Sequence, residues 1–96
     1  MELFVFGRFH VKVGKEKAYA EALGEVLRAS RGEEGCLEIH GYRSVRDARL
    51  YYIYSKWKSE AAFDEHARMA HTVKYLKRAE ELIEHELDVA RTVRIG

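Results

Sequence analysis

The 96-residue sequence predicts an α+β fold in a single domain, residues 1–96, with its elements in the order β-α-β-β-α-β. Apolar residues alternate with other residues in four segments, which is the period of a β-strand. In two further segments they recur every three to four residues, which is the period of an amphipathic helix. The chain contains no proline and no linker rich in glycine or serine, so nothing marks a domain boundary.

The first half of the chain predicts a strand, a helix and a second strand. Residues 3–12 alternate in the manner of a strand, with apolar side chains on both faces. Residues 15–30 repeat apolar side chains at helical spacing, with charged residues between them. Residues 36–45 alternate again, and they place Leu37 and Ile39 on one face. These three elements supply the first β-α-β unit.

The second half predicts a third strand, a helical region and a last strand. Residues 49–57 form a tyrosine-rich strand, which a short turn joins to the second one. Ser59 is suited to cap a helix, and the helical pattern resumes or continues as far as Ile83. Residues 86–95 predict a strand with apolar residues on one side, namely Leu87, Val89, Val93 and Ile95. This order is the ferredoxin-like arrangement, a four-stranded antiparallel sheet with helices on one face.

The second face of this sheet is unusually aromatic. A sheet that helices cover on one side normally shows polar residues on the other. Here the residues opposite the helix-facing set are Phe4, Phe6, His10, His40, Tyr42, Tyr52 and Tyr54. The predicted loops are too short to cover a sheet. We therefore expect a homodimer in which this aromatic face meets the same face of a second copy.

Charge and composition exclude several classes of function. Seventeen basic and sixteen acidic residues give a net charge of +1, without the basic field of a nucleic-acid-binding protein. Cys36 is the single cysteine, which excludes an intramolecular disulfide and a metal cage of thiolates. The first ten residues lack the pattern of a signal peptide, and no apolar run approaches the ~20 residues that span a membrane. We expect a cytoplasmic protein with no nucleic-acid and no membrane partner.

Four features in the same order resemble the antibiotic biosynthesis monooxygenase family. They are the order of elements, a first strand that leads into "VKVGKE", the segment "EEGCLEIHGYRS" at the second strand, and a spaced motif near the second helix. The motif consists of Trp57, Phe63, His66 and His71. The resemblance covers essentially the whole chain. It implies a dimeric α+β barrel with a small-molecule pocket between the sheet and the helices of each subunit.

The resemblance also implies a reaction. Family members of known activity oxidise polycyclic phenols or quinols with O₂, without a metal or flavin, whereas others degrade haem. Relatives that degrade haem carry an asparagine where this chain has Gly7, and their histidine ligand lies at another distance after the tryptophan at the end of the third strand. We expect a cofactor-independent monooxygenase that acts on a quinol-like or phenolic molecule. The alternative is a non-catalytic dimeric protein that binds small molecules or acts in a stress response.

The candidate site residues follow from the pocket that the resemblance implies. A neutral imidazole can remove a phenolic proton, and an indole N–H can donate a hydrogen bond to a substrate oxygen. His66 lies on the apolar face of the predicted helix, and Trp57 has the parity of the strand face toward the helices. Trp57 either walls the pocket or fills the core. The catalytic candidates are His66 and Trp57, and the substrate-binding candidates are Tyr51, Ile53, Phe63 and His71.

No metal ion and no cofactor are expected. His71 follows His66 by five residues, about 140° around an ideal helix, so the two rings diverge unless the helix breaks between them. A structural or capping role is therefore the alternative for His71. Helical histidines that bind a metal usually lie three or four residues apart, and no carboxylate of the second strand is an obvious third ligand.

Overall fold

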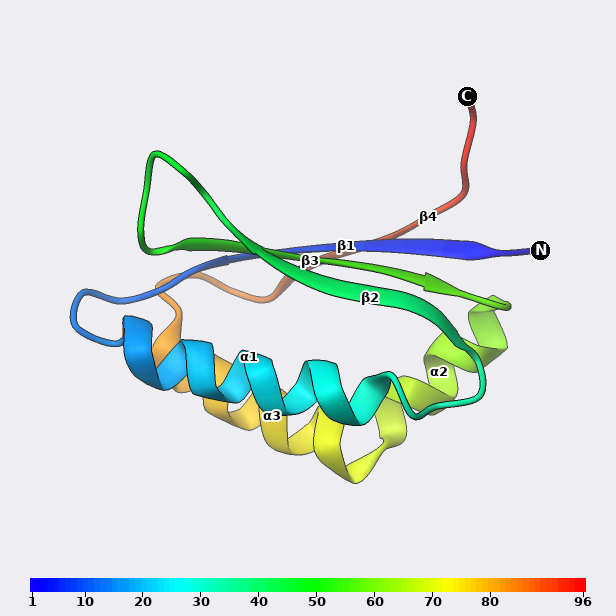
Figure 1. Cartoon of the computed structure of the whole chain (residues 1–96), viewed down its shortest axis with the longest axis horizontal. Coiled ribbons are helices and arrows are strands. Elements are labelled where there is room, and N and C mark those ends of the chain that lie inside the picture. Colours follow the sequence, from blue (N-terminus) through cyan, green and yellow to red (C-terminus); the bar gives the residue numbers. More distant parts are fainter.

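The computed structural model describes residues 1–96 and confirms the ferredoxin-like fold. In chain order, the elements are β1 (Leu3–His10), α1 (Glu16–Ser30), β2 (Cys36–Arg43), β3 (Leu50–Trp57), α2 (Glu60–Arg68), α3 (Ala70–Leu82) and β4 (Asp88–Thr92). The sheet has the order β2-β3-β1-β4 with antiparallel neighbours. All three helices lie on the same face of the sheet, and the other face carries no element of this chain (Figure 1). No helix is both long and apolar enough to cross a membrane.

In the two central strands, every second side chain points toward the helices. Leu3 on β1 lies opposite Trp57 on β3, and Phe9 lies opposite Tyr51. All four side chains are buried, as is Val5 between them. The parity expected from the sequence is therefore confirmed for these two strands.

The core consists of two clusters. The larger one contains the rings of Phe9, Tyr19, Tyr51 and Tyr75, and the hydroxyls of Tyr19 and Tyr75 are hydrogen-bonded at 2.7 Å. The smaller one contains Leu3, Val5 and Trp57, with Cys36, Ala62 and Phe63 packed against it. Tyr51, a candidate for substrate binding, is thus part of the larger core cluster.

The helical region after the third strand is two helices. Ser59 caps α2, since its hydroxyl oxygen accepts a hydrogen bond from the Ala62 N–H at 3.1 Å, as the sequence predicts. Met69 then adopts an extended conformation with ψ of 143°. Its N–H donates to the carbonyl of His66, while its own carbonyl accepts from the N–H of Thr72 in the first turn of α3. The helical pattern therefore resumes in a new direction.

Two strand predictions are wrong at their ends. Val93 and Ile95 were expected in the last strand, but they are 51% and 99% exposed because β4 ends at Thr92. Thr92 pairs with Phe4, and β1 begins only one residue earlier, so β1 offers at most one further residue for pairing. Leu37 is 41% exposed because a register shift between Cys36 and Glu38 turns it away from the core.

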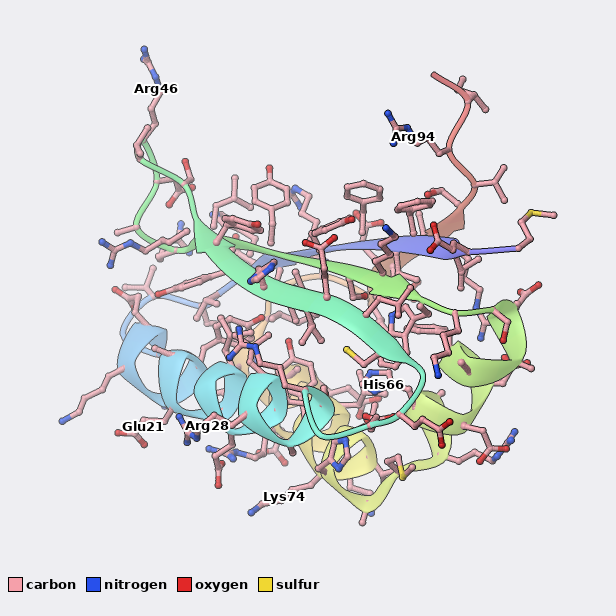
Figure 2. The ribbon with its side chains drawn as sticks, turned by 45° about the vertical axis from the view of Figure 1, so that its right-hand side comes forward. Glu21, Arg28, Arg46, His66, Lys74 and Arg94 are labelled. Carbon is pink, nitrogen blue, oxygen red and sulfur yellow. The ribbon has the colours of Figure 1, made fainter.

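The prediction that aromatic side chains lie on the second face of the sheet is confirmed. Phe6, Tyr42 and Tyr52 are 52%, 51% and 40% exposed, and side chains with aromatic rings stand on this side of the sheet in Figure 2. His10 differs from the other members of the face. Its ring lies between the carboxylates of Asp47, at 2.8 Å, and Glu84, so contacts within the chain already engage it.

Candidate functional site

A cavity of about 300 Å³ lies between the sheet and the helices. Eleven of its sixteen lining residues are hydrophobic, contributed by strands on one side and helices on the other. The remaining residues are Gly7, Ser55, His66, Thr72 and Arg91. This volume is at the lower end of the range of small-molecule sites, and a mostly apolar wall with a few polar groups is typical of them.

The cavity opens along β4. Leu87, directly before β4, and Val89 on β4 line the cavity and are 50% and 38% exposed, whereas Val5, Phe9 and Ile39 on the other strands are buried. β4 is an edge strand of the sheet, so no further strand closes this side. A ligand would therefore enter beside β4 and meet His66 and Thr72 inside.

His66 lies between the sheet and the helices, where Figure 2 labels it, and it is only 7% exposed. Its Nδ1 lies 2.7 Å from Oε2 of Glu33 and 3.3 Å from the hydroxyl of Thr72. A carboxylate only accepts hydrogen bonds, so this contact assigns the proton of a neutral His66 to Nδ1. Nε2 then carries a lone pair, and no protein group bonds to it in the structure.

The protonation of His66 reflects two opposing effects. Burial disfavours the imidazolium and lowers the pKa of His66 below its ordinary value of 6.5. The hydrogen bond and the negative charge of Glu33 act in the opposite direction without cancelling the effect of burial. His66 is therefore neutral at pH 7, and Nε2 can accept a proton.

Glu33 is a site residue that the sequence did not indicate. Its side chain is 7% exposed, whereas that of its neighbour Glu34 is 95% exposed. A Cβ on Gly35 would lie 2.5 Å from Cβ of Ala62, so the absence of a side chain at Gly35 lets this loop approach α2 closely. The one feature of the sequence that could have indicated Glu33 was its place in the "EEG" segment before the second strand.

His71 binds the same carboxylate, and the expectation that it faces elsewhere is wrong. Its Nε2 lies 2.7 Å from Oε2 of Glu33. The helix break at Met69 rotates α3 relative to α2, which returns His71 to the side of His66. The donor atoms of Glu33, His66 and His71 all lie within 4.8 Å of one another, and they are of the kinds that bind transition-metal ions.

Trp57 does not line the cavity, so of its two expected places, a pocket wall or the core, it occupies the core. It is fully buried, its ring centroid lies 4.4 Å from that of His66, and its Nε1 has no hydrogen-bond partner. It packs against the histidine and does not reach the cavity. Of the other candidates, Ile53 and Phe63 line the cavity, whereas Tyr51 and His71 do not.

Arg91 is a second residue that the sequence analysis missed. It lies on β4 at the opening, with its guanidinium 4.8 Å above the ring of Phe63. Its Nη1 donates to Asp64 at 2.7 Å and to Glu60 at 3.0 Å, which raises the pKa of Arg91 further. Arg91 thus connects the edge strand to α2. Leu87, Val89 and Arg91 occupy every second position of the predicted last strand, and this spacing could have placed Arg91 on the same face of the sheet.

Comparison with known proteins agrees with this architecture. Residues 3–78 match the family described as antibiotic biosynthesis monooxygenase. The chain belongs to this family. It is 30% identical over 82 residues to YcnE of Bacillus subtilis (strain 168), which is described only provisionally as a monooxygenase, and the match covers 85% of this chain and 86% of that protein.

Two solved structures show how widely the fold of this family member is shared. Rv0793 from Mycobacterium tuberculosis superposes with a TM-score of 0.94 at 22% identity, covering 100% of this chain and 97% of the other. PA3566 from Pseudomonas aeruginosa gives 0.90 at 22% identity, covering 99% and 95%. At this level of identity the likeness concerns the fold.

Gly7, where the family resemblance implies an asparagine in haem-degrading members, has no side chain and no room for one in this antibiotic biosynthesis monooxygenase family member. Gly7 lines the cavity on β1, and a Cβ there would lie 2.8 Å from Cε2 of Phe9. The ring of Phe9 therefore occupies the space that a side chain at this position would need, and the position contributes no polar group. The polar groups of the cavity come instead from the helices and from β3 and β4.

Proposed function

We propose that the protein is a cofactor-independent monooxygenase that oxidises a small phenolic or quinol-like molecule with O₂. One observation carries this proposal. His66 lines this mostly apolar cavity, Glu33 holds its Nδ1 at 2.7 Å, and no protein group bonds to its Nε2. Membership of the family and the similarity to YcnE support oxygen chemistry of this class. The cavity volume of about 300 Å³ favours a substrate of one or two rings.

The reaction requires one group that moves a proton. Nε2 of His66 removes the phenolic proton, and the carboxylate of Glu33 stabilises the imidazolium that forms. The electron-rich anion reduces O₂, and a carbon–oxygen bond forms at the ring to give a peroxide. His66 returns its proton to the peroxide, and the resulting hydroperoxide loses water together with the ring hydrogen. The product is a quinone, and the net reaction consumes one O₂ and releases one H₂O.

The remaining candidates position these groups. Trp57 and Phe63 lie with ring centroids 4.4 Å and 5.4 Å from that of His66, which restricts the imidazole to one orientation. Ile53 and Phe63 provide apolar surface for the substrate ring. Exclusion of water by these walls strengthens the interaction between the imidazolium and the carboxylate.

The proposal includes a homodimer through the aromatic sheet face. Phe6, Tyr42 and Tyr52 are large, exposed and close together on neighbouring strands, which is unfavourable for a surface in water. A second copy would cover them through the same surface on both partners. Sedimentation measurements on the wild-type protein and on Tyr52→Glu would show a dimer that this charge dissociates. A monomeric wild-type protein would contradict the proposal.

Oxygen uptake tests the reaction. The purified protein is mixed with a panel of mono- and bicyclic hydroquinones, and O₂ consumption is recorded for wild type, His66→Ala and Glu34→Gln. The Glu34 variant is the control because its side chain is 95% exposed and lies neither in the cavity nor on the aromatic sheet face. We expect uptake with at least one compound and a loss of at least about 10²-fold in His66→Ala alone. Binding without uptake would favour the non-catalytic alternative, and equal uptake in His66→Ala would exclude His66 as the base.

A further inference from the structure

We propose that Glu33, His66 and His71 form a binding site for a borderline divalent cation such as Zn²⁺, and that the bound cation switches off His66 as a base. The site has one carboxylate oxygen and two imidazole nitrogens. They come from the loop before β2, from α2 and from α3, which meet at the helix break. The inhibitory consequence rests on the proposed function, whereas the binding itself does not.

The donor set fits such a cation. Oε2 of Glu33 lies 2.7 Å from Nδ1 of His66 and from Nε2 of His71, and the three donor atoms lie within 4.8 Å of one another. Zn²⁺ binds these atom types at about 2.0–2.2 Å, so tetrahedral geometry places its ligands about 3.3 Å apart. Each carboxylate–imidazole separation therefore has to widen by about 0.6 Å, and the two imidazole nitrogens, which lie within 4.8 Å of each other, have to reach about 3.3 Å. Carboxylate and imidazole together suit Zn²⁺ and its transition-metal neighbours better than Mg²⁺ or Ca²⁺.

The cation can arrive without passing through the cavity. The side chains of Glu33 and His66 are 7% and 9% exposed, whereas that of His71 is 28% exposed. His71 does not line the cavity, so it approaches the cluster from the outer surface. The hydroxyl of Thr72 lies 3.3 Å from Nδ1 of His66, and this hydroxyl or a water molecule can supply the fourth ligand.

Binding would exchange the roles of the two nitrogens of His66. Without a cation, Nδ1 carries the proton and donates a hydrogen bond to Glu33, and Nε2 holds the lone pair of an imidazole that lines the cavity. A cation takes the lone pair of Nδ1, and a neutral imidazole then carries its single proton on Nε2. Nε2 thereby becomes a hydrogen-bond donor and can no longer remove the phenolic proton. The same cluster supports the reaction when it holds a proton and blocks it when it holds a cation.

Metal binding can be measured without any substrate. Zn²⁺ is titrated by calorimetry, and Co²⁺ is titrated by visible absorption, into wild type, His71→Ala, Glu33→Gln and the control Glu34→Gln, whose side chain is 95% exposed. We expect one ion per chain and a tetrahedral Co²⁺ spectrum for wild type and Glu34→Gln, with affinity at least tenfold weaker in the other two variants. Melting curves without metal verify that each variant is folded. Equal weakening in Glu34→Gln, or an absence of binding by wild type, would overturn the site.

Two readouts then separate the site from its consequence. ¹⁵N spectra of the histidines should show the proton of His66 on Nδ1 without Zn²⁺ and on Nε2 with it. Oxygen uptake by wild type should fall at least tenfold in Zn²⁺ concentrations that saturate the site, and a chelator should restore it. If Zn²⁺ binds and uptake persists, the inhibitory role is overturned. If Zn²⁺ does not bind while uptake depends on His66, the cation site fails and the proposed function stands.

Discussion

His66 and His71 both hydrogen-bond to Oε2 of Glu33 at 2.7 Å, although five residues of sequence would set them about 140° apart on one helix. The extended residue Met69 is the physical reason, because it ends α2 and lets α3 begin in another direction. One buried carboxylate therefore ties together the loop before β2 and both helices. Glu33 should matter for stability as well as for the chemistry of the site.

Glu33→Gln should destabilise the protein by about 1–3 kcal/mol. The neutral amide is a weaker acceptor for two N–H groups, and its own N–H₂ gains no partner in this buried position. Glu34→Gln is the matched control, since its side chain is 95% exposed and should change the free energy of unfolding by no more than about 0.5 kcal/mol. Urea unfolding at pH 7 measures both. Equal effects at the two neighbouring positions would show that Glu33 does not hold the three segments together.

The buried hydroxyl pair of Tyr19 and Tyr75 predicts non-additive substitutions. Their oxygens lie 2.7 Å apart, and burial raises the pKa of both, so both stay protonated. Tyr19→Phe or Tyr75→Phe alone leaves the other hydroxyl without this partner, at a cost of about 1–3 kcal/mol. The double substitution removes both polar groups and should cost less than the sum. A double-mutant cycle measured by thermal unfolding checks this, and additive effects would contradict it.

The order and parity of the central elements could be read from the sequence because each reflects a local period. Leu3, Val5 and Phe9 alternate in the chain and are buried together. The site depended on features without a local signature. The break at Met69 occurs where the residues on both sides are compatible with a helix, so nothing in the pattern showed that His71 returns toward His66. Glu33 and Glu34 look alike in the sequence, and only the close packing of Gly35 on α2 decides which is buried.

The turn between β2 and β3 predicts a dependence of stability on pH. The carboxylate of Asp47 accepts one hydrogen bond from the backbone N–H of Arg49 and is also hydrogen-bonded to the ring of His10. Both interactions lower the pKa of Asp47 below its ordinary value of 3.8. A pKa that is lower in the folded state contributes stability above the unfolded value and loses it as pH falls through the folded value. Wild type should therefore lose stability between about pH 5 and pH 2. Asp47→Asn retains an acceptor for Arg49 and should show a shallower slope there in urea unfolding at pH 6, 4 and 3. Parallel slopes would contradict the assignment.

Two glycines predict opposite effects of the same substitution. At Gly7 an added Cβ would lie 2.8 Å from the ring of Phe9, so Gly7→Ala must displace a buried side chain and reduce the cavity. It should destabilise the protein by about 1–3 kcal/mol and weaken the binding of any cavity ligand.

Gly24 lies inside α1, where a Cβ would meet only the flexible end of Arg28 at 3.3 Å. Gly24→Ala should therefore stabilise the protein by about 0.5–1 kcal/mol through helix propensity and leave ligand binding unchanged. Thermal unfolding together with fluorescence titration of a naphthol separates the two cases. If Gly7→Ala were as well tolerated as Gly24→Ala, the space beside β1 would be larger than the structure shows, and the preference for one or two rings would no longer follow.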